Sequence, residues 1–354
     1  MKIKQVTNFL ENIAPLEYQE NYDNCGLIVG DAKAEVNGSL ITLDCTEAVI
    51  DEAIATGCNL VIAHHPIIFS GLKKLNGSNY IERTVIKAIK NNIAIYAIHT
   101  NLDNVHNGVN AKIAEKLGLI NCKVLALKSD LLRQLVVYCP IENSEALKIA
   151  LYENGAGAVG DYDKCSFTSV GKGSFRANEN CTPFVGEIGK QHTENEERIE
   201  VIYPKFKERA ILDAMQVAHP YQEVAHSIYV LENKHQLVGS GIIGELKTPV
   251  NTEVFLESLK TKMQTKCIRH TLIVKEKIQR IAVCGGSGSF LLNNAKAAKA
   301  DVFITADFKY HEFFDAENKL KERWGWIEKE EKVLYLLMVF GFYKQIKNLK
   351  KTSR

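Results

Sequence analysis

The sequence has no marked excess of charge of either sign. Its 354 residues include 44 lysines and arginines against 42 aspartates and glutamates. Proteins that bind nucleic acid or anionic membranes through their surface charge usually carry a basic excess. The balance argues against both partners and favours small molecules, or further copies of the same chain, as what this protein binds.

Paired cysteine motifs and long apolar segments are also absent. The nine cysteines are scattered and never spaced as C-x-x-C, which favours reduced thiols over a disulfide framework. Residues 1–20 mix lysine and glutamate with apolar residues at helical spacing, unlike the apolar centre of a signal peptide. The apolar run at residues 333–343 is too short to cross a bilayer. We therefore expect a cytoplasmic protein that does not insert into a membrane.

The beginning of the chain predicts an α/β arrangement. An apolar stripe over residues 3–13 is typical of a helix. A strand over 39–43 is followed by a helix over 47–56, with Thr46 as its expected N-cap, and this helix leads into a second strand ending at residue 63. Such βαβ units have parallel strands and a right-handed connection. Asp44 and His64 should therefore emerge at the same edge of the sheet.

The second of these strands ends in the sequence His64-His65-Pro66. Ligands of open α/β sheets bind at the carboxyl ends of the strands, and neutral imidazole is the commonest metal-binding side chain. Two interpretations stay open at this point, a pair of metal ligands and a hydrogen-bonded pair in the core. Successive strand residues point to opposite faces, so the ligand interpretation requires either a twist after His64 or a different ion for each histidine.

A further strand, predicted over residues 93–98, ends in a similar polar segment. It delivers His99, Asp103 and His106 to the same edge. An isolated loop aspartate more often caps a turn than binds a metal, but the neighbouring histidines favour a ligand role for Asp103. Helices are predicted on either side of this strand, over 80–90 and over 109–117, the second ended by a glycine.

The middle of the chain differs in character. From about Lys123 the pattern is β-α-β, β-α-β, with helices over 145–154 and 207–217, which is typical of an α+β ferredoxin-like unit. His219 and His226 follow the second helix, where a loop or interface role is favoured over a second metal or ligand site.

After residue 237 the sequence again predicts a βαβ pattern, with helices over 250–263 and 290–299. One constant offset relates Ile62 and Ala63 to Ile304 and Thr305, which suggests two related lobes whose strand ends face one cleft. On that offset His65 corresponds to Asp307. The glycine-rich segment 285–289 is neither a dinucleotide fingerprint nor a P-loop, and a tight turn is favoured there over an anion site.

Several motifs, taken in order, resemble a known family, the dinuclear-metal-centre hexameric proteins labelled GTP cyclohydrolase 1 type 2 homologues. They are Asp23-Asn24-Cys25-Gly26-Leu27, Leu43-Asp44, His64-His65-Pro66, Asn101-Leu102-Asp103, Cys284-Gly285-Gly286-Ser287-Gly288 and Ile304-Thr305-Ala306-Asp307-Phe308-Lys309-Tyr310-His311. The resemblance implies a first α/β lobe over 1–123, a PII/CutA-like insert over 124–236 and a second lobe over 237–354. It also implies a toroidal homohexamer.

The resemblance further implies a site of two divalent ions per chain that activates water for hydrolysis of a nucleotide or related heterocycle. His64, His65 and Asp103 match the ligands of that site, and His99 and His311 match supporting residues. Such a ligand set does not distinguish Zn, Mn, Fe, Co or Ni. The alternative function is a non-enzymatic hexameric assembly that binds metal or a small ligand.

The chain departs from the family after Leu320. The family supplies another histidine near its end and, four residues later, a glutamate that bridges the two metals. From residue 321 to Arg354 this sequence contains no histidine. The resemblance therefore implies an atypical C-terminal tail and a metal site weakened by it.

Overall fold

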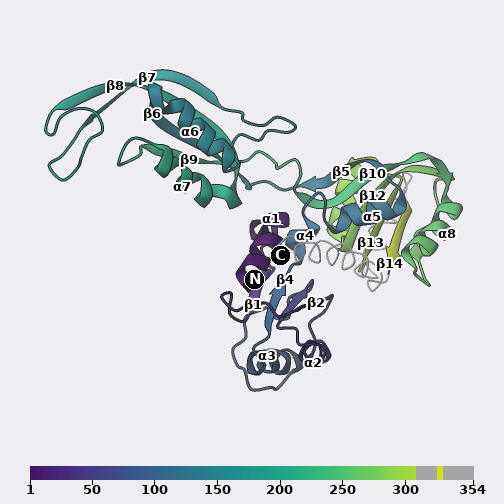
Figure 1. Cartoon of the computed structure of the whole chain (residues 1–354). Helices are drawn as coiled ribbons and strands as arrows, with labels where there is room; N and C mark the ends of the chain where they lie inside the picture. The colour runs from purple at the N-terminus through teal and green to yellow at the C-terminus, as the bar shows by residue number, and fades with distance from the viewer. Residues whose placement is uncertain (308–324, 330–354) are drawn as a thin grey trace. The chain divides into compact units, whose positions relative to one another are not determined.

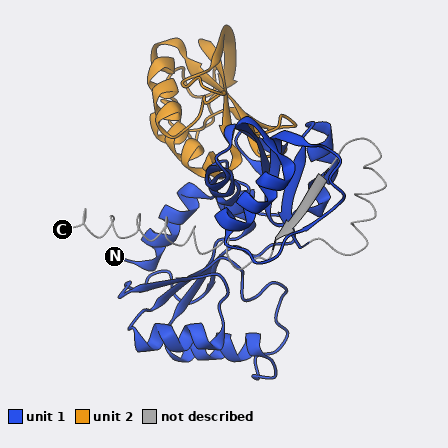
Figure 2. Ribbon diagram, turned by 90° about the vertical axis from the view of Figure 1, so that its right-hand side faces the viewer, with its two compact units in different colours: residues 1–127, 237–354 blue, residues 128–236 orange. Residues whose placement is uncertain are grey.

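The computed structural model describes residues 1–307 and 325–329. Residue contacts divide the chain into two compact units, shown in Figure 2. Unit 1 combines residues 1–127 with the described residues from 237 onward, and unit 2 comprises residues 128–236. No helix in the described ranges is long and apolar enough to cross a membrane.

The first sheet of unit 1 has the strand order β1-β4-β3-β2. Its strands are β1 (Gly26–Val29), β2 (Ser39–Thr42), β3 (Leu60–Ala63) and β4 (Ala94–Ala97). β3 pairs in parallel with both β2 and β4, whereas β1 is antiparallel to β4. Every residue of β3 and β4 is buried, because helices or other apolar groups cover both faces of the sheet, as parallel strands require.

Two helices cover one face of this sheet, and a third covers the other. α2 (Glu47–Ala55) and α3 (Tyr80–Lys90) lie together below the strands in Figure 1. They pack on Val61 and Ile95, whereas α1 (Ile3–Ile13) belongs to the apolar cluster of the opposite face. As predicted, Thr46 caps α2, its hydroxyl accepting from the backbone N–H of Val49 at 3.4 Å.

The second sheet of unit 1 has the order β11-β14-β13-β12-β10-β5. Its strands are β5 (Ile120–Leu127), β10 (Gly239–Asn251), β11 (Arg269–His270), β12 (Lys277–Ser287), β13 (Val302–Ala306) and β14 (Gly325–Lys329). β12, β13 and β14 are parallel, and β10 runs antiparallel to both β12 and β5. Both sheets therefore contain a parallel βαβ unit next to an antiparallel strand.

Two predicted helices of this region begin later than expected. α8 spans Thr252–Met263 because Asn251 ends the strand β10 and caps the helix, accepting from Glu253 and Val254. Residues 285–287 continue the strand β12, and a short 3₁₀ turn, η3 (Ser289–Leu291), precedes α9 (Leu292–Ala297). The glycine-rich segment is thus mostly strand, and it does not place a helix start at residue 290.

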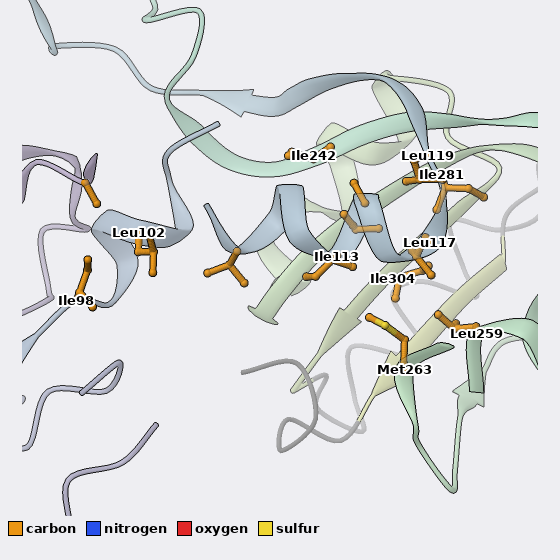
Figure 3. Close-up of a cluster of buried hydrophobic side chains, with 14 of the residues drawn as sticks. Ile98, Leu102, Ile113, Leu117, Leu119, Ile242, Leu259, Met263, Ile281 and Ile304 are labelled. Atoms are coloured by element: carbon orange, nitrogen blue, oxygen red, sulfur yellow. The ribbon is translucent and has the colours of Figure 1, made fainter. Parts of the chain in front are cut away.

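A large apolar cluster joins the elements of unit 1. α5 (Val109–Leu117) packs on the second sheet, and its Ile113 and Leu117 lie toward Ile281 and Ile304 in Figure 3. Burying a leucine or isoleucine of this kind stabilises the fold by about 1.5–3 kcal/mol. Gly118 ends α5 with a φ of +79°, the left-handed conformation that glycine adopts most easily.

Ahead of α5 lie the short helices η1 (Leu16–Tyr18) and α4 (Thr100–Asp103). The segment around Asp103, expected as a loop, is therefore one helical turn at the end of β4. Its Leu102 joins the same apolar cluster as Ile113. This packing fixes Asp103 beside the carboxyl ends of the first sheet's strands.

Unit 2 is an antiparallel sheet with helices on one face. The elements are β6 (Leu132–Pro140), α6 (Ile141–Glu153), β7 (Phe167–Arg176), β8 (Gln191–Pro204), η2 (Lys205–Lys207), α7 (Glu208–Ala218) and β9 (His226–Leu231). The sheet order is β7-β8-β6-β9, which gives the β-α-β-β-α-β arrangement of ferredoxin-like units. The unit begins at Lys128, four residues after the expected boundary, because β5 stays paired with β10 as far as Leu127.

Candidate metal centre

The backbone bends directly after β3, and this bend brings His64 and His65 to the same side. Both stay anchored to the neighbouring strand, with the N–H of His64 bonded to the carbonyl of Thr42 at 3.1 Å and that of His65 to the carbonyl of Leu43 at 2.9 Å. Their ring centroids are 5.1 Å apart. The sequence left two arrangements open, a twist after His64 or a different ion for each histidine, and the structure has the twist.

His99 joins the pair from the end of β4. Its ring centroid lies 5.1 Å from that of His64 and 5.4 Å from that of His65. One nitrogen of each of the three rings lies within 4.8 Å of the others. We call His64, His65 and His99 the histidine cluster. In the part of the chain that the structure describes, no other group of histidine, cysteine and acidic side chains has this metal-ligand geometry.

Asp23 holds His99 in place. Its Oδ1 lies 2.9 Å from His99 Nδ1, and its Oδ2 accepts from the backbone N–H of Thr100 at 3.0 Å and from the Thr100 hydroxyl. The Asp23 side chain is fully buried. Burial alone would raise the pKa of Asp23, but the hydrogen bonds from His99 and Thr100 lower it well below its usual value. A charged carboxylate therefore fixes Nδ1 of His99 as a donor and leaves Nε2 to face the cluster.

Asp44 plays the same part for His65, at the sheet edge where the sequence placed Asp44 beside His64. Its Oδ1 lies 2.8 Å from His65 Nδ1. Unlike Asp23, the Asp44 side chain is 61% exposed. Carboxylates that bond the second nitrogen of a histidine set its tautomer and raise its basicity as a metal ligand. Two of the three imidazoles thus carry this support.

The chemical state of the cluster fits a metal ion. His64 is 6% exposed, and burial, reinforced by the neighbouring histidines, lowers its pKa well below the usual value. His64 is therefore neutral at pH 7, and neutral imidazole is the form that binds metal ions.

Asp103 is the fourth group at this site. Its Oδ1 lies 3.9 Å from His64 Nε2, too far for a hydrogen bond. That oxygen is buried, with no hydrogen-bond partner among the described residues, and burial raises the Asp103 pKa to about 7. A buried carboxylate oxygen left unsatisfied is costly, and a cation beside the histidines would remove that cost. The donor set therefore fits a divalent ion.

The second lobe reaches the site through its glycine-rich strand end. The backbone N–H of Gly285 donates to Asn110 Oδ1 at 2.8 Å, and Asn110 Nδ2 donates to the carbonyl of Asp103 at 3.0 Å. Burial, followed by the charge of Asp103, raises the pKa of the Cys284 thiol. Cys284 is therefore a neutral neighbour of Asp103.

Other predicted site residues lie elsewhere. His106 and Asp307 are outside the histidine cluster, and Asp307 is exposed. His219 and His226 belong to unit 2. His311 lies outside the described residues, as does the tail after Leu320, apart from the backbone of β14.

Sequence reasoning did not assign a role to Asp23, and it gave His99 only a supporting one. Asp23 is 76 residues from His99 in the sequence, and their contact depends on the antiparallel pairing of β1 with β4. The signal available in the sequence was the polar loop Asp23-Asn24-Cys25 ahead of a buried strand.

Fold and site together define a class of α/β protein with an imidazole and carboxylate centre at the carboxyl ends of a parallel sheet. A sequence profile of the Duf34/NIF3 (NGG1p interacting factor 3) family matches residues 1–321. The chain belongs to this family. The match ends one residue after Leu320, where the sequence was found to depart from the family's motifs.

Similar proteins agree with this assignment. A Bacillus subtilis protein named GTP cyclohydrolase 1 type 2 homolog is 38% identical over 314 residues, which are 88% of this chain and 84% of that protein. The crystal structure of a Bacillus cereus protein related to NIF3 is 36% identical, with a TM-score of 0.85 over 100% of this chain and 94% of that one. That of the Staphylococcus aureus protein SA1388 is 30% identical, with a TM-score of 0.75 over 99% and 94%.

Proposed function

We propose that this protein is a metal-dependent hydrolase that acts on a nucleotide or related heterocycle. The observation that carries the proposal is the histidine cluster itself, three imidazoles converging at strand ends, two of them oriented by carboxylates. Its relatives' name, GTP cyclohydrolase 1 type 2 homolog, supports a nucleotide such as GTP as the substrate.

His64, His65 and Asp103 would hold divalent metal, two ions per chain by the family resemblance, and His99 lies close enough to add a further nitrogen. When bound, such ions lower the pKa of a water molecule and polarise the bond that the water attacks. Asp23 and Asp44 keep His99 and His65 in one tautomer and orientation. Burial of His64 keeps its ring neutral and excludes bulk water from the inner side of the site.

The test is turnover by the purified full-length protein after loading with Zn²⁺, Mn²⁺ or Fe²⁺. GTP and other nucleotides are supplied, and products are separated by chromatography. We expect turnover that His64→Ala abolishes and that His226→Ala, an exposed histidine on β9 of unit 2, leaves unchanged. A metal-loaded protein that turns over no nucleotide would overturn the hydrolase proposal.

That outcome would favour the alternative, a non-enzymatic assembly that binds metal or a small ligand. Metal content distinguishes it from a damaged site, because fewer than one ion per chain after loading would indicate that the altered C-terminus has impaired binding. Both functions are compatible with the histidine cluster, so the turnover measurement decides between them.

A toroidal homohexamer in the cytoplasm is also part of the proposal. The family resemblance supports the assembly, and nine free cysteines support a reducing compartment. Light scattering coupled to gel filtration should give six times the chain mass of 39.6 kDa. A monomeric mass would contradict the assembly without affecting the metal site.

A further inference from the structure

Unit 2 contains a cavity that the proposed hydrolytic site does not use. It has a volume of about 610 Å³ and is lined by β7, β8 and the loops at 177–184 and 221–225. Small-molecule pockets in proteins usually measure about 300–1,000 Å³. All of its lining residues belong to unit 2, so the cavity is independent of the histidine cluster.

Strand register explains why the cavity exists. Ile199 faces the core beneath α6 and α7, and Thr168 is its partner on β7. Because side chains alternate across a sheet, Gly171 and its partner Glu196 face the opposite side, which carries no helix. Gly171 and Gly173 place no side chains on that face, and an ideal Cβ at Gly171 would meet nothing within 4 Å. The glycines thus leave the floor of the cavity bare.

A buried carboxylate lies across this floor. Glu196 is 8% exposed, and an ideal Cβ at Gly173 would stand 2.1 Å from its Oε2. The carboxylate therefore occupies the space that any other residue at position 173 would need. Burying a carboxylate in this way is unfavourable unless a hydrogen-bond donor or a cation pairs with it.

Aromatic rings form the wall beside that carboxylate. The ring centroid of Tyr221 lies 5.9 Å from that of Phe175 and 6.3 Å from that of Phe184. The Tyr221 hydroxyl is buried and lies beside the Glu196 carboxylate, which can accept a hydrogen bond from it. Burial, together with the nearby Glu196 carboxylate, raises the Tyr221 pKa, so the phenol stays protonated.

The loop that carries Tyr221 is held rigidly. His219 Nε2 lies 2.8 Å from the carbonyl of Tyr138, and His219 Nδ1 accepts from the backbone N–H of Tyr221 at 3.0 Å. This fixes both nitrogens of His219 and explains why His219 serves the loop and is not a metal ligand. The wall is therefore formed before any ligand arrives, which reduces the entropy cost of binding.

We propose that this cavity binds a small planar molecule with two adjacent N–H donors, such as an amidinium, a guanidinium or a 2-aminopyrimidine-type ring. The two oxygens of Glu196 suit a pair of parallel N–H groups. The faces of Phe175 and Tyr221 suit a flat ring or a delocalised cation. Arg198 lies on the same face, and its ion pair in the structure is with Glu200 at 2.7 Å.

Titration calorimetry on the full-length protein tests the proposal with two probes. Benzamidine represents a cationic source of the paired N–H groups. Guanosine represents a neutral heterocycle, and inosine, which lacks the exocyclic amino group, is its matched control. We expect saturable binding of benzamidine, or of guanosine in preference to inosine. The absence of saturable binding for both probes would overturn the proposal.

Two variants locate the binding. Glu196→Gln should weaken it about tenfold or more, because a hydrogen bond to a charged group is lost. Gly171→Val should abolish it by filling the cavity, and the open space there lets the variant fold. Gly71→Val, a matched change in open space within unit 1, should bind as the wild type does. Unchanged binding in Gly171→Val would refute the location, and unchanged binding in Glu196→Gln would refute the ligand class. Metal content should be the same in all three variants.

Discussion

Replacing Asp23 by asparagine should weaken both the metal centre and the fold. The Asp23 carboxylate meets His99 Nδ1, the Thr100 N–H and the Thr100 hydroxyl in a fully buried position. Asparagine offers one acceptor oxygen in place of two, so at least one of these buried donors loses its partner. An unsatisfied buried donor costs about 1–3 kcal/mol of unfolding free energy.

The effect on metal affinity follows from the tautomer of His99. Loss of a carboxylate that orients a metal-binding histidine typically weakens binding about 10–100-fold, or about 1.4–2.8 kcal/mol. Competition with a chromophoric zinc chelator measures this affinity, and urea unfolding of the metal-free protein measures stability. Asp44→Asn is the matched control. Since its side chain is 61% exposed, it should lower affinity about tenfold but change stability by less than about 0.5 kcal/mol.

The two measurements separate the possible roles of Asp23. Lower stability with unchanged metal affinity would show that Asp23 supports only the fold, and the reasoning about His99 would then be refuted. Unchanged values of both quantities would contradict the hydrogen-bond network itself.

Three further predictions concern the fold. Leu117→Ala should cost about 2–5 kcal/mol of unfolding free energy because Leu117 is 1% exposed. Ile54→Ala, at a site 44% exposed, should cost far less. Urea unfolding of the two variants measures this difference. Burial alone would raise the pKa of Asp301, but hydrogen bonds from Lys275 and two backbone N–H groups lower it. Its contribution to stability should therefore be present at pH 7 and be lost below about pH 4, and Asp301→Asn should remove that pH dependence. Gly30→Ala should destabilise the protein strongly, since φ at Gly30 is +107° and the new Cβ would stand 2.7 Å from the backbone of Ala94. Thermal unfolding followed by circular dichroism should show a lower midpoint, and a wild-type midpoint would contradict the prediction.

Much of the first lobe could be predicted because its signals are local. The helix over residues 80–90 and the cap at Thr46 were predicted as the structure has them, since amphipathic spacing and capping depend on neighbouring residues. The parallel pairing of β2 and β3 followed from the βαβ connection, and with it the position of Asp44 at the same sheet edge as His64. That Asp44 contacts His65 was seen only in the structure.

The errors arose where tertiary pairing overrides local pattern. Val250 and Asn251 have helical spacing with the residues that follow, but pairing with β12 keeps them in the strand β10. Likewise, the glycines at 285 and 286 suggested a turn, although they continue β12. Local propensity is a weak guide at such boundaries.

The candidate site was predicted in part for the same reason. His64 and His65 stand out as adjacent residues after an apolar run, so their strand-end position could be inferred. The convergence of His99 and the support from Asp23 depend on a bend after Ala63 and on the β1–β4 pairing. Neither feature has a local sequence signature.

The central claim is that the histidine cluster binds a divalent metal ion. The most direct measurement is elemental analysis of the zinc-loaded, full-length protein, combined with X-ray absorption at the zinc edge. We predict at least one ion per chain with imidazole ligands, and loss of that ion in a variant combining His64→Ala with His65→Ala. A double variant that retains the wild-type zinc content and imidazole signal would contradict the account.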